Sequence, residues 1–229
     1  MRGLACLFLT SVSLICIAGS AEADIPWYVA GDAGASLRMD ASRSTTFSNK
    51  TGTTGPGTNK VTFDTGPAVY LEVGYRLPNH LRVEGELGYS QDSVSSASPL
   101  SLNGAFPALV GARLPLQSGG GRNNYSATIN AFYDMPVSEQ FIPYVGAGIG
   151  VDDLAAATAH FGEPGARPIF TEDGGQIMNA AILGEAGVAI ALNNRWPIIP
   201  AYRYEHIFTT GTAFRNDANI LKLGVRRSF

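Results

Sequence analysis

The residues of this chain that could do chemistry are charged side chains spaced two apart within otherwise apolar segments. In residues 81–89, Arg82, Glu84 and Glu86 alternate with apolar residues and glycine. Because successive side chains of a β-strand point to opposite faces, these three would share one face. Carboxylates and guanidinium groups gathered on one face can form ion pairs, or they can line a polar passage. The pattern therefore predicts an ionic core or a narrow pore.

The same spacing recurs along the chain and predicts one set of polar residues facing a common lumen. Seven of its members are acidic and five are basic, and the two signs occur at similar depth. A mixed set favours a cross-linked polar plug over a conducting channel, although a small porin-like channel for small solutes remains the alternative. The predicted set is Asp32, Glu72, Arg76, Arg82, Glu84, Glu86, Asp134, Glu185, Arg203, Glu205, Lys222 and Arg226.

Residues typical of catalytic or metal sites are sparse. The three histidines, His80, His160 and His206, have no Ser or carboxylate partner at an informative spacing in the sequence, so any partner would have to meet them in space. Both cysteines, Cys6 and Cys16, fall in the N-terminal leader. We therefore expect no enzymatic activity, no cofactor and no bound metal.

Eight segments alternate apolar and polar residues with a period of two, as half-buried β-strands do. Short turns are expected near 78–80, 136–141 and 193–197; long loops are expected near 38–60, 91–123 and 153–177, with a shorter one near 209–217. Because lipid offers no hydrogen-bond partners, a sheet can span a membrane only if it closes. The sequence predicts an all-β fold: an eight-stranded antiparallel transmembrane up-and-down β-barrel with long extracellular loops and short periplasmic turns. The strands are expected at 27–37, 69–77, 81–89, 124–135, 143–152, 178–192, 199–208 and 219–229.

A soluble β-sandwich or lipocalin-like barrel would also alternate, with its apolar face inside. The two folds differ in where the apolar face of the sheet lies: inside in the soluble fold, and against lipid in the membrane barrel. The membrane barrel predicts that Val73, Leu87, Ile129, Ile149, Ile190 and Leu223 face lipid. It also predicts a periplasmic aromatic belt and an outer one. The first comprises Trp27, Tyr75, Tyr133, Trp196 and Phe229, and the second Phe63, Tyr89, Tyr125 and Phe208.

The first 23 residues have the features of a secretory signal peptide. A short basic start is followed by the apolar run 4–19 and by the small-x-small site Ala21-Glu22-Ala23. The apolar run is too short for a transmembrane helix, which needs about 20 apolar residues. We expect cleavage before Asp24, leaving 24–229 as the barrel domain.

Several motifs resemble the opacity and surface-antigen superfamily of small, eight-stranded OmpA- or OmpX-like bacterial outer-membrane proteins. They include Trp27-Tyr28-Val29-Ala30-Gly31, the segment 81–89, Asn130-Ala131-Phe132-Tyr133-Asp134, the segment 143–150 and Tyr202-Arg203-Tyr204. The resemblance implies residence in the outer membrane, among lipid and lipopolysaccharide. The superfamily includes surface antigens, adhesins, small pores and structural barrels, so the resemblance leaves the activity open.

The final strand, ending at Phe229, resembles the signal that the barrel-assembly machinery reads in outer-membrane proteins. Arg227 stands two residues before it, where that class usually has an aromatic or apolar residue.

The loops are expected to carry the function. The apolar stretch 105–116, with Phe106, Leu109, Val110 and Leu114, is a candidate contact loop for a host or cell-surface protein, unless it folds over the barrel mouth or dips into the outer leaflet. A net charge of −3 argues against nucleic acid as a partner. We expect a monomer.

Overall fold

In the computed structural model, the described residues are 26–48, 54–102, 110–162, 165, 168–191, 196–208 and 216–229. The predicted signal peptide lies outside them. None of the described segments is a helix long and apolar enough to cross a membrane. Thirteen strands occur in this part of the chain: β1 (Trp27–Arg38), β2 (Ala41–Ser48), β3 (Thr54–Asp64), β4 (Gly66–Arg76), β5 (Leu81–Leu102), β6 (Leu114–Gly119), β7 (Gly121–Asp134), β8 (Phe141–Ala156), β9 (Ala159–Phe161), β10 (Phe170–Glu172), β11 (Gly175–Ala191), β12 (Pro197–Phe208) and β13 (Asn216–Ser228).

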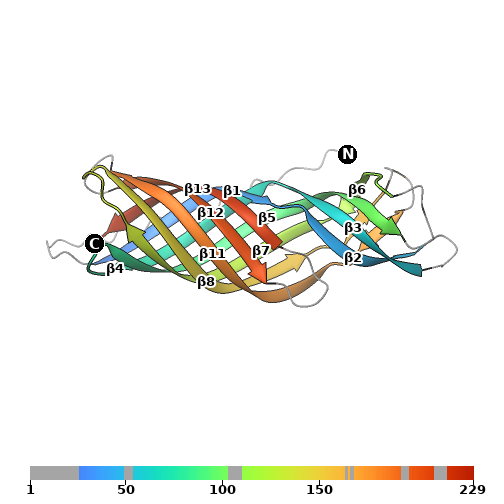
Figure 1. Ribbon diagram of the computed structural model, residues 1–229, viewed down its shortest axis with the longest axis horizontal. Helices are drawn as coiled ribbons and strands as arrows, with labels where there is room; N and C mark the ends of the chain where they lie inside the picture. Colours follow the sequence, from blue (N-terminus) through green and yellow to red (C-terminus); the bar gives the residue numbers. More distant parts are fainter. Residues whose placement is uncertain are drawn as a thin grey trace, which may run out of the picture.

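Eight of these strands close into a ring by antiparallel hydrogen bonding. Figure 1 shows the barrel with its long axis horizontal. The order around the ring is β1, β4, β5, β7, β8, β11, β12 and β13, and β13 pairs with β1 again. The closing pair runs along the length of both strands, from Tyr28 opposite Ser228 to Arg38 opposite Ala218. The predicted eight-stranded barrel is confirmed.

Burial alternates along every ring strand and decides between the two possible faces. Leu87 and Ile149, for example, are 65% and 68% exposed, whereas Glu86, adjacent to Leu87, is buried. Val73, Ile129 and Leu223 are exposed in the same way, and Ile190 is half-buried. An apolar exterior around a charged interior is the reverse of a soluble barrel, so the soluble alternative is wrong.

The hairpin between β4 and β5 is as short as the sequence predicts. Asn79 and His80 both have φ of 63°, and the Leu77 amide donates to the Leu81 carbonyl at 2.7 Å. Two consecutive residues with positive φ are the mark of a type I′ turn, whose twist matches that of the strands. This tight connection fixes the register of β5, and with it the lumen side of Arg82, Glu84 and Glu86.

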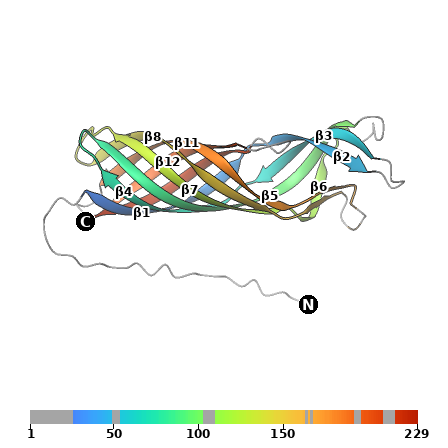
Figure 2. The ribbon, with the colours of Figure 1, turned by 90° about the horizontal axis from the view of Figure 1, so that it is seen from below.

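The predicted long loops are largely strands, which is a correction to the sequence analysis. Strands β2 and β3, which take up most of segment 38–60, pair with each other, and β5 runs for 22 residues, far past the expected end at 89. These strands form an extension beyond the barrel, at the end opposite the C-terminus (Figure 2). Segment 38–60 is rich in Ser and Thr, but the pairing of β2 with β3 and of β3 with β5 overrides local composition.

The extension has its own apolar cluster, formed by Val61, Val94, Ala97, Leu114, Ala159 and Phe161. Leu114 is buried there, so its assignment to a contact loop was wrong; it supports the extension from within. Val110 is 45% exposed, as a contact residue must be. Phe106 and Leu109 lie outside the described residues.

Aromatic side chains mark the two ends of the membrane band. Trp27 packs against Tyr75 at 4.9 Å between ring centroids at the end with short turns, and Tyr89 packs against Tyr125 at 5.1 Å at the other. Phe63 was wrongly assigned to the outer belt. It packs against the apolar cluster of the extension, with the Arg122 guanidinium 4.7 Å from its ring.

Candidate functional site: the charged lumen

The alternating strands bring most of the predicted lumen residues together inside the barrel. Ten of the twelve are buried: Asp32, Glu72, Arg82, Glu84, Glu86, Glu185, Arg203, Glu205, Lys222 and Arg226. Asp134 is half-buried at the periplasmic end. Arg76 is a correction: it is exposed, because its strand ends there, and its guanidinium lies 5.3 Å from the Tyr28 ring.

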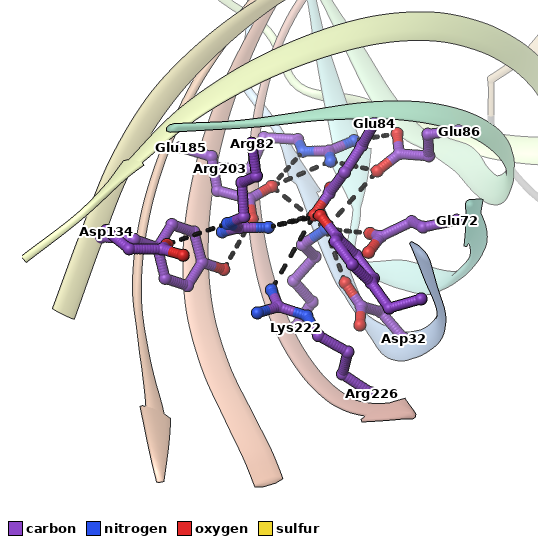
Figure 3. Close-up of polar contacts among 12 residues, drawn as sticks. Asp32, Glu72, Arg82, Glu84, Glu86, Asp134, Glu185, Arg203, Lys222 and Arg226 are labelled. Atoms are coloured by element: carbon purple, nitrogen blue, oxygen red, sulfur yellow. Dashed lines mark hydrogen bonds and ion pairs between the residues drawn. The ribbon is translucent and has the colours of Figure 1, made fainter. Parts of the chain in front are cut away.

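Arg203 and Lys222 form the centre of the ionic network (Figure 3). Arg203 donates Nη1 to Glu86 Oε1 at 2.6 Å, and a second bond from Nη2 to Glu86 Oε2 makes the pair bidentate. Its Nε donates to Glu185 Oε2 at 2.9 Å. The Lys222 ammonium lies 2.6 Å from Asp32, 3.0 Å from Glu185, 3.1 Å from Glu72 and 3.6 Å from Glu86. We call these six residues the central cluster.

A second group closes the periplasmic side of the lumen. Arg82 Nε donates to Asp134 Oδ1 at 2.9 Å, and Arg82 also pairs with Glu84. Glu84 accepts a hydrogen bond from the Tyr28 hydroxyl, and Arg226 Nη2 lies 3.8 Å from Glu84. Each charge in this group faces an opposite charge, as buried ions require.

Aromatic rings that the sequence analysis did not single out fill the space between the ions. The Arg82 guanidinium lies 4.2 Å from the Phe132 ring centroid and 4.3 Å from that of Tyr144, and Arg203 lies 4.7 Å from Tyr70. Inward glycines make room for them: a Cβ on Gly146 would collide with Phe132. The sequence could have predicted their inward position, because each aromatic residue lies an even number of positions from a charged residue of its own strand and so shares its face.

A third polar layer, at the extracellular end of the lumen, was also missed. Arg38 Nε donates to Asp92 Oδ2 at 2.6 Å, and Arg122 lies 3.5 Å from Asp92. Asn124 donates to Asp152 at 2.5 Å. Arg38, Asp92 and Arg122 continue the inward parity of their strands. The alternation of inward and outward residues could have predicted their place in the lumen, but they lie in, or at the border of, segments that the sequence analysis interprets as loops.

The histidines do meet partners in space. His206 Nδ1 lies 2.5 Å from Asp217 Oδ1 on the neighbouring strand, and His160 Nδ1 lies 3.0 Å from the Thr171 hydroxyl. A His–carboxylate pair of this kind fixes the orientation of the imidazole. Among the described residues, no group of three or more His, Cys, Asp and Glu side chains is arranged to hold a metal ion.

Comparison with known families accounts for this architecture. Residues 4–229 match the model of the outer membrane protein beta-barrel domain family. The chain belongs to this family. Membership places this outer-membrane barrel in the bacterial outer membrane. No curated protein sequence matches the chain.

Solved structures similar to this outer-membrane barrel include three small barrels. Neisserial surface protein A is 16% identical, with a TM-score of 0.49, over 89% of this chain and 97% of that one. Ail of Yersinia pestis, in complex with the heparin analogue sucrose octasulfate, is 13% identical, with a TM-score of 0.41, over 87% and 98%. The N-terminal barrel of Pseudomonas aeruginosa OprF is 13% identical, with a TM-score of 0.41, over 88% and 97%.

The arrangement inside this outer-membrane barrel suits cross-linking better than transport. An eight-stranded barrel has an interior just wide enough to be filled by side chains. Here, buried pairs join strands on opposite sides of the ring, and aromatic rings such as Phe132 and Tyr144 stack on the guanidinium of Arg82. The lumen residues therefore hold the wall together chemically, through charge-assisted hydrogen bonds.

Proposed function

We propose that this outer-membrane barrel acts as a surface contact protein of the antigen or adhesin kind, through the extracellular β extension, while its lumen serves as a structural core. The observation that carries the proposal is the extension itself. Strands β2, β3, β5, β6 and β9 continue the fold past the outer aromatic belt and surround an apolar cluster of their own. An ordered platform of this kind holds surface residues in fixed positions, which lowers the entropic cost of binding a partner.

The partner proposed for this platform is a host or other cell-surface protein. Val110 is exposed, whereas Leu114, four residues later in the chain, is buried in the platform. Lipid and lipopolysaccharide would surround the apolar wall, and the barrel-assembly machinery would recognise the last strand and Phe229. We expect the barrel to act as a monomer whose ring closes within one chain.

The filled lumen supports a structural core over a small porin-like channel. Three successive layers obstruct a path along the axis: the Arg82 group, the central cluster and the Arg38–Asp92 layer. Moving an ion through would require separating buried charge pairs, and each uncompensated charge costs about 3–5 kcal/mol.

Two measurements test the proposal. Replacing residues 103–110 with a Gly/Ser segment of equal length leaves the apolar cluster intact, so the barrel should fold and binding of expressing cells to host cells or matrix should fall. A Gly/Ser replacement of the periplasmic turn 136–139 is the matched control and should bind normally. Unchanged binding after the 103–110 replacement, or stable unitary conductance of the wild-type barrel in planar bilayers, would overturn the proposal.

A further inference from the structure

One side of the lipid-facing wall carries an open hollow of about 940 Å³. Most of the residues that line it are outward members of β1, β8, β11, β12 and β13, and Figure 1 shows β11, β12 and β13 next to one another in the wall. The exposed residues Ala186, Pro200 and Leu223 are among them. Because these residues are apolar and lie between the two aromatic belts, the hollow opens toward hydrocarbon.

Arg227 lies at the periplasmic end of the same wall. It follows Leu223 by four residues on β13 and therefore shares its outward face, because side chains of a strand alternate. Leu223 lies opposite Pro200 across the β12–β13 ladder, and the Arg227 guanidinium lies 5.2 Å from the ring of Trp196, just before β12 begins. A continuous column of outward residues thus leads from the guanidinium to the hollow.

Arg227 differs from the lumen arginines in its partners. Arg82 and Arg203 each pair with carboxylates, whereas Arg227 forms no ion pair within the described residues and contacts the Trp196 ring instead. A guanidinium presents a planar fork of donors that matches the oxygens of a phosphate, and it can do so while it lies on an aromatic ring. Tryptophan at a membrane interface sits at the level of the lipid headgroups. This guanidinium therefore lies where lipid phosphates lie.

We propose that this face of the barrel binds a glycerophospholipid of the periplasmic leaflet, with Arg227 paired to the phosphate and an acyl chain in the hollow. The dimensions agree. Leu221, in the upper part of the hollow, is six residues from Arg227, which is about 20 Å along the strand at about 3.3 Å per residue. With strands tilted by about 35–45°, the depth is about 15 Å, or one leaflet of a hydrocarbon core about 30 Å thick.

The shape and charge of this face favour a phospholipid over other occupants. Two barrels meet wall to wall as convex surfaces, so a second copy would leave the hollow unfilled and Arg227 without an anion, whereas a flexible chain with a phosphate at its end satisfies both. The Tyr202 hydroxyl donates to Asn219 Oδ1 at 2.6 Å, which holds the Tyr202 ring at the upper rim of the hollow. The inference is independent of what the extension binds.

The experiment measures the lipid that the barrel retains. Mature barrels are folded into vesicles of phosphatidylglycerol and phosphatidylethanolamine, extracted into mild detergent and analysed by native mass spectrometry. Wild type should keep one phospholipid, and Arg227→Gln should keep about tenfold less, because it loses a charge-assisted pair. Arg76→Gln is the matched control: it removes an exposed guanidinium from the same end of the barrel, on β4, and should retain lipid as wild type does.

A second arm tests the hollow separately from the cation. Ala186→Leu fills the hollow and leaves Arg227 in place, so retention should fall by about threefold as the packing of the chain is lost. Ala131→Leu adds the same side chain to an exposed position on β7 outside the hollow and should change nothing. Diacylglycerol, which lacks the phosphate, and glycerol phosphate, which lacks the chains, should each be retained about tenfold less than the phospholipid.

Four outcomes would overturn the proposal. They are a wild-type barrel without bound lipid, equal retention by wild type and Arg227→Gln, equal losses in Ala186→Leu and Ala131→Leu, and equal retention of diacylglycerol and phospholipid. A lipid-free dimer in place of the first complex would assign the hollow to a second copy of the chain. If Arg227→Gln does not fold, the comparison of lipids on wild type and the two leucine variants decide the question.

Discussion

Arg203 on β12 and Glu86 on β5 join opposite sides of the barrel, with Arg203 Nη1 2.6 Å from Glu86 Oε1. The two strands are four steps apart in either direction around the eight-stranded ring. The pair therefore spans the lumen, and Glu185 extends it to β11. A link across the diameter resists flattening of the ring, which hydrogen bonds between neighbouring strands do not.

Removing the cation from this link should destabilise the barrel strongly. Arg203→Met leaves Glu86 buried without its bidentate partner and removes one of the three donors to Glu185, so we expect a loss of about 3–5 kcal/mol in the free energy of unfolding. Urea unfolding in lipid vesicles measures it. Arg227→Met, which removes a guanidinium 5.2 Å from Trp196 at the periplasmic end, is the control and should cost about 0.5–1 kcal/mol. Equal losses for the two variants would contradict a diametric cross-link.

A lysine on the lipid face should be costly only within the membrane band. Ile129 is 66% exposed and lies midway between Tyr125 and Tyr133 on β7, so Ile129→Lys should cost about 2–4 kcal/mol. Leu100 is 46% exposed on the extracellular part of β5, so Leu100→Lys should cost little. The heat-modifiable shift on gels, read after folding into bilayers, compares them. If Ile129→Lys folds as efficiently as Leu100→Lys, the band lies elsewhere.

Most of the barrel could be predicted from the sequence because its strands obey a strict period of two. The residues of a strand that face lipid must be apolar. The alternation alone therefore assigned Glu86 and Lys222 to the lumen, without the order of strands around the ring. Parity could not show which charges meet. Arg203 and Glu86 are 117 residues apart, and their contact depends on the order and tilt of strands around the ring.

The extension could not be predicted, because its stability comes from elsewhere in the chain. Strand β2 is rich in Ser and Thr and has no clear alternation, yet it pairs with β3, which pairs in turn with β5. The prediction for Arg76 failed for a different reason. The alternation places Arg76 correctly on the inner side of its strand, but the strand ends there and leaves the side chain exposed.

The mature protein should begin at Asp24. The expectation rests on the Ala21-Glu22-Ala23 site, since small residues at these positions suit signal peptidase. N-terminal sequencing of the protein from the outer-membrane fraction checks it. Ala23→Arg should block cleavage, whereas Ala23→Ser should not. An outer-membrane product that retains Met1 would contradict the prediction.

The extension should unfold without the barrel when its apolar cluster is damaged. Phe161 is fully buried in that cluster, away from the lumen ions, and Phe161→Ala should cost about 3–5 kcal/mol locally. Because the ring strands keep their own hydrogen bonds and ion pairs, the heat-modifiable shift should be unchanged while limited proteolysis from outside cuts the extension much faster.

Val110→Ala provides the matched control for that experiment, because it shortens an exposed apolar side chain without opening a cavity. Its cleavage rate should equal that of wild type. If Phe161→Ala abolishes the heat-modifiable shift, the extension and the barrel fold as one cooperative unit. In that case the apolar cluster supports the ring as well as the surface platform, because strands β5, β7 and β8 run continuously from the lipid band past the outer belt.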